Sequence, residues 1–208
     1  MKVSLLINDQ DVAAANGATF ERLNPISGAI ASTAAAAGAH DATAAADAAA
    51  AAFPAWSALG PNERRARLNR AADLLQSRAK EFVTIMTAEI GAASAWAQFN
   101  VRLATQMLRE AAAMTTQICG EVMPSERTQR LAMSIRQPAG VAVGIAPWNA
   151  PIILAVRAIA MPLACGNTVI LKASELCPGT HRMIGDVMRD AGLGAGVGFR
   201  RFAAAAGL

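Results

Sequence analysis

The sequence predicts an α/β protein in which a helical N-terminal part leads into the first βαβ unit of a parallel sheet. Two continuous apolar runs, VAVGIA and NTVILK, have the composition of parallel strands that are buried on both faces. About fifteen residues of helical character separate them, which is the connection that a βαβ unit requires. Two long amphipathic stretches come before this unit and need a sheet to pack against.

Short, turn-rich segments at the start of the chain predict a small β excursion from Val3 to Ala37, in which the NPISG of residues 24–28 marks a turn. The alanine-rich stretch from His40 to Leu59 predicts a helix. Asp41 lies near its start, where an acid favours the helix dipole, and Pro54 should end or kink it.

Two amphipathic helices follow. The first should begin at Pro61 and continue to Gly91, because apolar residues recur at three- and four-residue intervals, as in Leu68, Ala71, Ala72, Leu75 and Ala79. The second should run from about Ala93 to Cys119, with Gly120 closing it. After them the alternation in RLAMSIRQ predicts a half-exposed strand whose apolar face carries Leu131, Met133 and Ile135.

The composition excludes several classes of protein. Every long apolar stretch is interrupted before the roughly 20 residues that a membrane span needs, and the N-terminus does not resemble a signal peptide. From the lack of a span and of a signal peptide we expect a cytoplasmic protein. Three cysteines without C-x-x-C spacing indicate neither a disulfide framework nor a zinc site, so we expect reduced thiols. The net charge of +4 is spread over helical surfaces without clustered aromatics, which favours solvated helix faces over a nucleic-acid partner.

Polar side chains stand where the two predicted strands end, and ligands collect at this edge of open parallel sheets. Asn149 follows the first strand, Lys172 ends the second, and Glu175 comes three residues later. Taken alone, Asn149 before Pro151 suits a helix N-cap, and Lys172 with Glu175 suits a surface ion pair. The chemical alternatives are an amide that donates to a developing oxyanion, and a charged pair that binds the hydroxyls of a ribose.

The usual glycine fingerprints of nucleotide binding are absent, since Phe199 stands where G-x-G-x-x-G needs its third glycine, and no P-loop occurs. The run GIAPWNAPIILAVRAIAMPLACGNTVILKASE instead resembles the NAD(P)-dependent aldehyde dehydrogenase superfamily, whose members carry P-W-N, P-L-x-x-G-N and K-x-x-E at this spacing. NPISG and the helix from Pro61 also fit, so the resemblance extends from Phe20 to Gly196. It implies a partial aldehyde dehydrogenase cofactor-binding domain.

The resemblance also implies roles for single residues. Asn149 is the expected catalytic residue, whose amide donates to the oxyanion of a thiohemiacetal. Lys172 and Glu175 are expected to hold the adenosine ribose, and the rest of the cofactor cleft falls on Ile145, Ala146, Pro147, Trp148 and Ser174. The expected cofactor is NAD, because a carboxylate beside the ribose repels the 2′-phosphate of NADP.

Two departures from the family pattern concern the substrate. Ala150 stands where many members have a bulky aromatic residue, and Arg157 lies seven residues later on the same helical stripe. The space suits an aromatic ring and the arginine suits a phenolate, as in the aromatic-aldehyde branch of salicylaldehyde, vanillin and benzaldehyde dehydrogenases. The alternative is that Arg157 only extends from a core helix into solvent.

The nucleophilic cysteine and the general-base glutamate of the family belong to F-x-x-x-G-Q-x-C and E-L-G-G contexts, which these 208 residues do not contain. We expect Cys119, Cys165 and Cys177 to be structural. We also expect a disrupted reading frame or gene near Gly196, which would leave an inactive fragment.

Four regions are therefore expected: 1–124 with the β excursion and helices, 125–139 as an oligomerisation strand, 140–196 as the βαβ unit, and 197–208 as a non-family tail, for which a frameshift is the hypothesis. The expected function is NAD-dependent oxidation of an aromatic aldehyde to the carboxylic acid, by a homo-oligomer (dimer or tetramer) without a membrane partner. The alternative is a non-catalytic nucleotide-binding or interaction module.

Overall fold

A five-stranded sheet forms the centre of the computed structural model, which describes residues 1–193 and the backbone of residues 197–200. Its strands, in spatial order, are β3 (Gln10–Val12), β2 (Leu5–Ile7), β10 (Val197–Arg200), β9 (Thr168–Lys172) and β8 (Val141–Ile145). β8, β9 and β10 are parallel, whereas β2 runs antiparallel to both β10 and β3. The predicted βαβ unit is confirmed.

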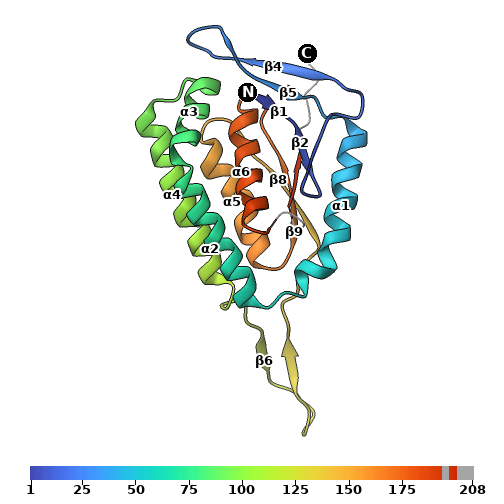
Figure 1. The fold of residues 1–208 in the computed structure, drawn as a ribbon. Helices are drawn as coiled ribbons and strands as arrows, with labels where there is room; N and C mark the ends of the chain where they lie inside the picture. Colours follow the sequence, from blue (N-terminus) through green and yellow to red (C-terminus); the bar gives the residue numbers. More distant parts are fainter. Residues whose placement is uncertain (194–196, 201–208) are drawn as a thin grey trace.

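Helices cover both faces of this sheet (Figure 1). α1 (Ala39–Ser57) packs on one face, and α5 (Pro151–Ala164) and α6 (Pro178–Asp190) pack on the other. A further layer over α5 and α6 is built from α2 (Pro61–Ser77), α3 (Ala79–Ile90) and α4 (Ser94–Met114). The main core lies between these helices and the sheet, and its largest fully buried side chains include Phe82, Leu68, Leu108, Ile159 and Leu163.

The predicted β excursion is present as a second sheet, ordered β1-β5-β4, of β1 (Lys2–Val3), β5 (Ile30–Ala35) and β4 (Thr19–Leu23). The turn between β4 and β5 is the predicted NPISG. The Asn24 side chain accepts from the Ile26 N–H at 2.8 Å, and Gly28 closes the turn with φ +71°, a conformation that favours glycine.

The first helix confirms the expected role of its acid. Asp41 accepts from the backbone N–H of Gly38 at 2.8 Å and of Ala15 at 3.0 Å, so its carboxylate closes the start of α1 and ties it to the preceding loop. Pro54 does not end the helix, which continues to Ser57. Near a helix C-terminus, the carbonyl that loses its bond to Pro54 can be solvated instead.

The helix predicted from Pro61 to Gly91 is wrong as a single element, because Arg78 (φ −90°, ψ 15°) separates α2 from α3. Periodicity alone does not reveal this break, since apolar residues continue on both sides of it. The helix predicted to end at Cys119 ends at Met114, so Cys119 and Gly120 belong to the connection that follows.

Three arginines of α2 were expected on a solvated face, but they bond to the C-terminal ends of other helices. Arg64 donates to the Ala164 carbonyl of α5 at 3.1 Å, and Arg65 to the Ala112 carbonyl of α4 at 3.2 Å. Arg67 donates at 2.7 Å to the carbonyl of Gly192, just after α6. Neither α4 nor α5 has a basic residue in its own last turn, so α2 supplies the cations that their dipoles favour.

The two strands of the βαβ unit differ in burial. In β9 the apolar side chains are buried, as expected, with Val169 and Leu171 fully inaccessible. β8 is not buried on both faces: Val143 is 66% and Ile145 is 72% exposed. β8 is the outer strand of the sheet, and a Cβ on Gly144 would meet Ala158 of α5, so the side chains of Val143 and Ile145 lie on the opposite face, the side of α1.

The strand predicted near residues 131–136 forms one arm of a hairpin that projects from the body of the molecule (Figure 1). β7 (Ala132–Ser134) pairs antiparallel with β6 (Glu121–Met123), a strand that the sequence did not indicate. Both arms of the hairpin are exposed.

Among the helices of residues 1–193, none is long and apolar enough to cross a membrane.

Residues 197–200 were expected to begin a non-family tail, but their backbone forms β10 beside β9. Backbone hydrogen bonds need no particular side chain, so the edge of β9 can pair with a segment of unusual sequence. The rest of the expected tail, residues 201–208, lies outside the described residues.

Candidate functional site

The expected site lies where β8 and β9 end side by side. Ile145 and Lys172 are register partners in the parallel ladder, and the N–H of Ala146 donates to the Lys172 carbonyl at 3.0 Å. The segment that carries P-W-N therefore leaves the sheet beside the loop that carries K-x-x-E. This adjacency of Asn149 and Lys172 at one edge of the sheet is the arrangement that the sequence predicted.

Asn149 is not the cap of the helix that follows it. The N-cap of α5 is Ala150, and within the described residues no side chain caps this helix. The Asn149 side chain is exposed, while its backbone carbonyl accepts from the indole Nε1 of Trp96 at 3.3 Å. The side-chain amide of Asn149 is thus exposed near the strand ends and does not cap α5.

Lys172 and Glu175 form an ion pair with 3.5 Å between Nζ and Oε2. Their side chains are 22% and 45% exposed, so both charges can reach solvent at the strand end. An exposed pair of this kind contributes at most about 1 kcal/mol to stability. The structural reading of the pair and its expected contact with a ribose are therefore compatible.

The other residues expected in the cofactor cleft differ in exposure. Ile145 and Trp148 are 72% and 50% exposed and Pro147 is exposed, whereas Ala146 belongs to the buried core. Ser174 is only 4% exposed, and its hydroxyl accepts from the Leu176 N–H at 3.2 Å. The exposed members follow one another closely in the sequence, at the end of β8.

Two residues of the P-L-x-x-G-N motif, Gly166 and Asn167, contact the segment that leads into β8. The Asn167 side-chain oxygen accepts from the N–H groups of Ala139 at 2.7 Å and Gly140 at 3.1 Å. Gly166 has φ +84°, and a Cβ placed on it would lie 2.9 Å from the Pro138 side chain. The motif is thus needed for a close approach of two backbone segments.

An aromatic pair beside Asn149 was missed in the sequence. The rings of Trp96 and Phe99 on α4 stack with centroids 5.5 Å apart, and the two residues are 43% and 40% exposed. Aromatic residues make up only 4% of this chain. Two of them, three residues apart on a predicted helix, could therefore have indicated an aromatic surface. Of the expected substrate residues, Ala150 is buried at the N-cap of the neighbouring helix α5, and Arg157 is exposed on that helix.

The three cysteines lie in different parts of the fold, and none of them is in a disulfide within the described residues. Cys119 is exposed before the hairpin, Cys165 ends α5 at the opposite end from Asn149, and Cys177 is fully buried at the start of α6.

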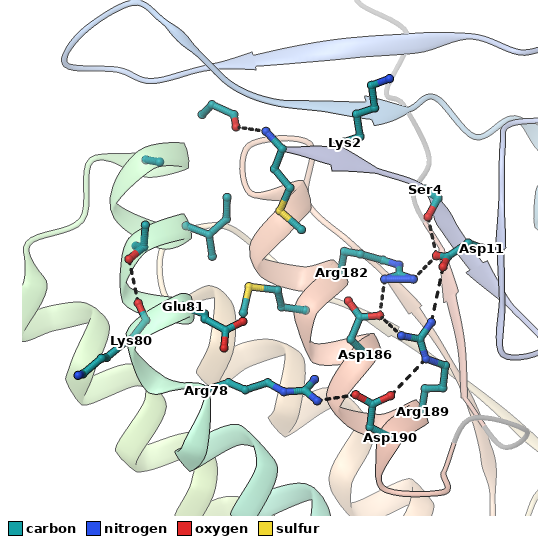
Figure 2. Close-up of a pocket in the computed structure, with 16 residues that line it drawn as sticks. Lys2, Ser4, Asp11, Arg78, Lys80, Glu81, Arg182, Asp186, Arg189 and Asp190 are labelled. Atoms are coloured by element: carbon teal, nitrogen blue, oxygen red, sulfur yellow. Dashed lines mark hydrogen bonds and ion pairs between the residues drawn. The ribbon is translucent and has the colours of Figure 1, made fainter.

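A groove of about 870 Å³ lies elsewhere, between α3, α6 and the N-terminal strands (Figure 2). Its walls carry ion pairs that link Arg182 and Arg189 to Asp11, and Arg78 to Asp190. A hydrogen bond from Ser4, helped by the two arginines, lowers the pKa of Asp11 below its usual value. The Arg78 hydrogen bond lowers the pKa of Asp190 in the same way.

Comparison with known proteins identifies the family. The model of the aldehyde dehydrogenase family matches residues 12–198. The chain belongs to the aldehyde dehydrogenase family. A vanillin dehydrogenase of Pseudomonas fluorescens is 61% identical over 95% of this chain and 41% of that protein. A salicylaldehyde dehydrogenase of Pseudomonas putida is 45% identical over the same shares. The chain thus spans about two fifths of the length of these relatives.

Solved structures share the fold of this chain. A salicylaldehyde dehydrogenase from Pseudomonas putida G7, complexed with salicylaldehyde, superposes with a TM-score of 0.95 at 41% identity and covers 98% of this chain and 42% of its own. PnpE in complex with nicotinamide adenine dinucleotide gives a TM-score of 0.94 at 31% identity, with coverage of 98% and 42%. The α/β fold of the N-terminal part of an aldehyde dehydrogenase is therefore shown.

Proposed function

We propose that this chain supplies the cofactor-binding and oxyanion-binding part of an enzyme that oxidises an aromatic aldehyde to the carboxylic acid with NAD. The main support is the register of β8 and β9. Ile145 pairs with Lys172, so the segment that carries Asn149 (the Asn149 turn) and the K-x-x-E loop leave the sheet side by side, at the carboxyl ends of the two strands. The vanillin and salicylaldehyde dehydrogenases among the relatives support an aromatic substrate.

Each polar side chain of the proposed site has a role that its exposure permits. The Asn149 amide donates to the oxygen of the tetrahedral adduct, where a fixed dipole stabilises developing charge. Lys172 donates to the adenosine ribose and Glu175 accepts from its hydroxyls, as their partly exposed ion pair allows. The bound nicotinamide would accept the hydride. Ala150 leaves room for the aromatic ring, and Arg157 binds an acidic substituent.

A cysteine thiolate must form the adduct, and none of the three described thiols is placed for it. Cys177 is buried and Cys165 lies at the far end of α5 from Asn149. We therefore propose that the 208 residues alone do not turn over aldehyde. NADH formation from an aromatic aldehyde that disappears in Cys165→Ser or Cys177→Ser would contradict this.

Nucleotide binding is the direct test. Calorimetric titration should give binding of NAD, and Lys172→Ala should raise the dissociation constant by about tenfold or more, as expected for a charged hydrogen bond. Lys80→Ala is the matched control, because Lys80 is an exposed lysine on α3 and its loss changes the net charge equally. Equal NAD affinity in wild type and Lys172→Ala would exclude the ribose role.

The preference for NAD over NADP depends on Glu175. Glu175→Gln removes the charge that repels the 2′-phosphate. The dissociation constant for NADP should therefore fall toward that for NAD. Tighter binding of NADP than NAD by the wild type would reverse this proposal.

The hairpin favours a second property, self-association. Its exposed apolar side chains are Val122 (74%), Met123 (46%), Leu131 (68%), Met133 (50%) and Ile135 (69%). Paired strands with open edges and apolar faces are typical association surfaces. We propose a homo-oligomer built through this hairpin. If NAD does not bind, an interaction module without catalysis remains the second candidate.

A further inference from the structure

A fully buried histidine joins the two loops of the proposed site. His181 lies in the first turn of α6 with 0% exposure. Its Nδ1 is 3.0 Å from the backbone N–H nitrogen of Ser174, and its Nε2 is 3.1 Å from the carbonyl oxygen of Pro151. A backbone N–H can only donate and a carbonyl can only accept, so these partners select the neutral ring with its proton on Nε2.

One partner belongs to the proposed site and the other lies next to it. Ser174 lies between Lys172 and Glu175, in the middle of the loop that should hold the ribose. Pro151 begins α5 two residues after Asn149. One imidazole ring therefore fixes the backbone of the ribose loop relative to the start of the helix that follows the oxyanion residue.

The ring is itself held by the start of α6. Glu89 of α3 is fully buried and accepts from the N–H of Gly179 at 2.7 Å and of Thr180 at 2.9 Å. Gly179 also packs closely, because a Cβ on it would lie 3.1 Å from Glu89 Oε1 and from Ile85. The first residues of α6 are thus fixed against α3, and His181 comes directly after Thr180 in the same turn.

We propose that His181 is a positioning residue of the dinucleotide site, which sets the separation of the Lys172–Glu175 loop and the Asn149 turn. This inference rests on the proposed function. A core histidine without this role would contribute stability only. The positioning role predicts in addition that nucleotide affinity falls when the two hydrogen bonds are lost and returns when an equivalent donor and acceptor are supplied.

Three variants separate these roles. His181→Ala removes both bonds and should raise the dissociation constant for NAD about tenfold, the ratio expected for one well-formed hydrogen bond. His181→Gln offers one acceptor and one donor and should restore the affinity to within about threefold of wild type. Met188→Ala removes another fully buried side chain of α6, two turns away, and should leave the affinity within about twofold, since distant sites act independently.

Hydrogen exchange measures the hydrogen bond between the Ser174 N–H and His181 without any nucleotide. The Ser174 amide should be protected in the wild type and in Met188→Ala, and should lose protection in His181→Ala relative to the amides of α4. NAD affinity in His181→Ala equal to wild type, or reduced equally in Met188→Ala, would overturn the inference. A wild type that binds no NAD would overturn the proposed function instead. The protection of the Ser174 amide would then show only whether His181 connects the two segments.

Discussion

Glu89→Gln tests how far the start of α6 depends on one buried carboxylate. Its Oε1 accepts from Ser32 Oγ and the Gly179 N–H, both at 2.7 Å. Its Oε2 accepts from the N–H and the hydroxyl of Thr180, both at 2.9 Å. The two backbone donors bond to different oxygens, so either orientation of a glutamine amide turns its NH₂ group toward one backbone N–H. The hydroxyls can rotate to accept, but that backbone donor remains unsatisfied.

The magnitude follows from this geometry. A buried donor left without a partner costs about 1–3 kcal/mol, and the lost interaction of a charge with the helix dipole costs up to about 2 kcal/mol. We therefore expect Glu89→Gln to lower the free energy of unfolding by about 3 kcal/mol. Urea titration followed by far-UV circular dichroism measures it. Glu110→Gln, at an exposed glutamate of α4, is the matched control and should change stability by less than about 0.5 kcal/mol. A loss below about 1 kcal/mol in Glu89→Gln would refute the reasoning.

Three more outcomes are expected. The hydrogen bond from Arg78 lowers the pKa of Asp190 in the folded state. As the pH falls, the unfolded state therefore takes up a proton on Asp190 before the folded state does. The stability that this pair contributes is present above the usual aspartate pKa of 3.8 and is lost as the pH falls below it. Asp190→Asn should flatten this acid limb in unfolding experiments, and an unchanged limb would contradict the assignment. Gly144→Ala places a Cβ 2.8 Å from that of Ala158, so we expect a loss of about 1–3 kcal/mol in the same unfolding assay. Met133→Lys puts a charge on the hairpin and should shift the sedimentation profile toward smaller species, whereas an unchanged profile would place self-association elsewhere.

The strand ends could be predicted from the sequence because their signals are local. Two apolar runs with a helix-length connection specify a parallel pair, and Asn149 and Lys172 directly follow or end those runs. Family motifs then added roles to positions that the pattern had already placed together. The exposure of β8 was not predictable, because it depends on which strand lies at the edge of the sheet and how far α1 reaches.

Residues that act through distant partners gave no usable signal. Glu89 appears in the sequence as one more acid on a helix, yet its partners Ser32 and Thr180 are 57 and 91 residues away. His181 likewise bonds to Pro151, 30 residues earlier. The break at Arg78 is equally hidden, since the apolar period is compatible with both one helix and two. Such features follow from tertiary packing, which no short window of sequence contains.

The arginines of α2 have a consequence for synthesis of the protein. Their carbonyl partners lie 47, 100 and 125 residues further along the chain. On the ribosome these guanidinium groups emerge long before the helix ends that they complete, and the last bond can form only after Gly192 has left the exit tunnel. A nascent chain that stalls before this point would keep α2 only partly docked and accessible to chaperones and proteases.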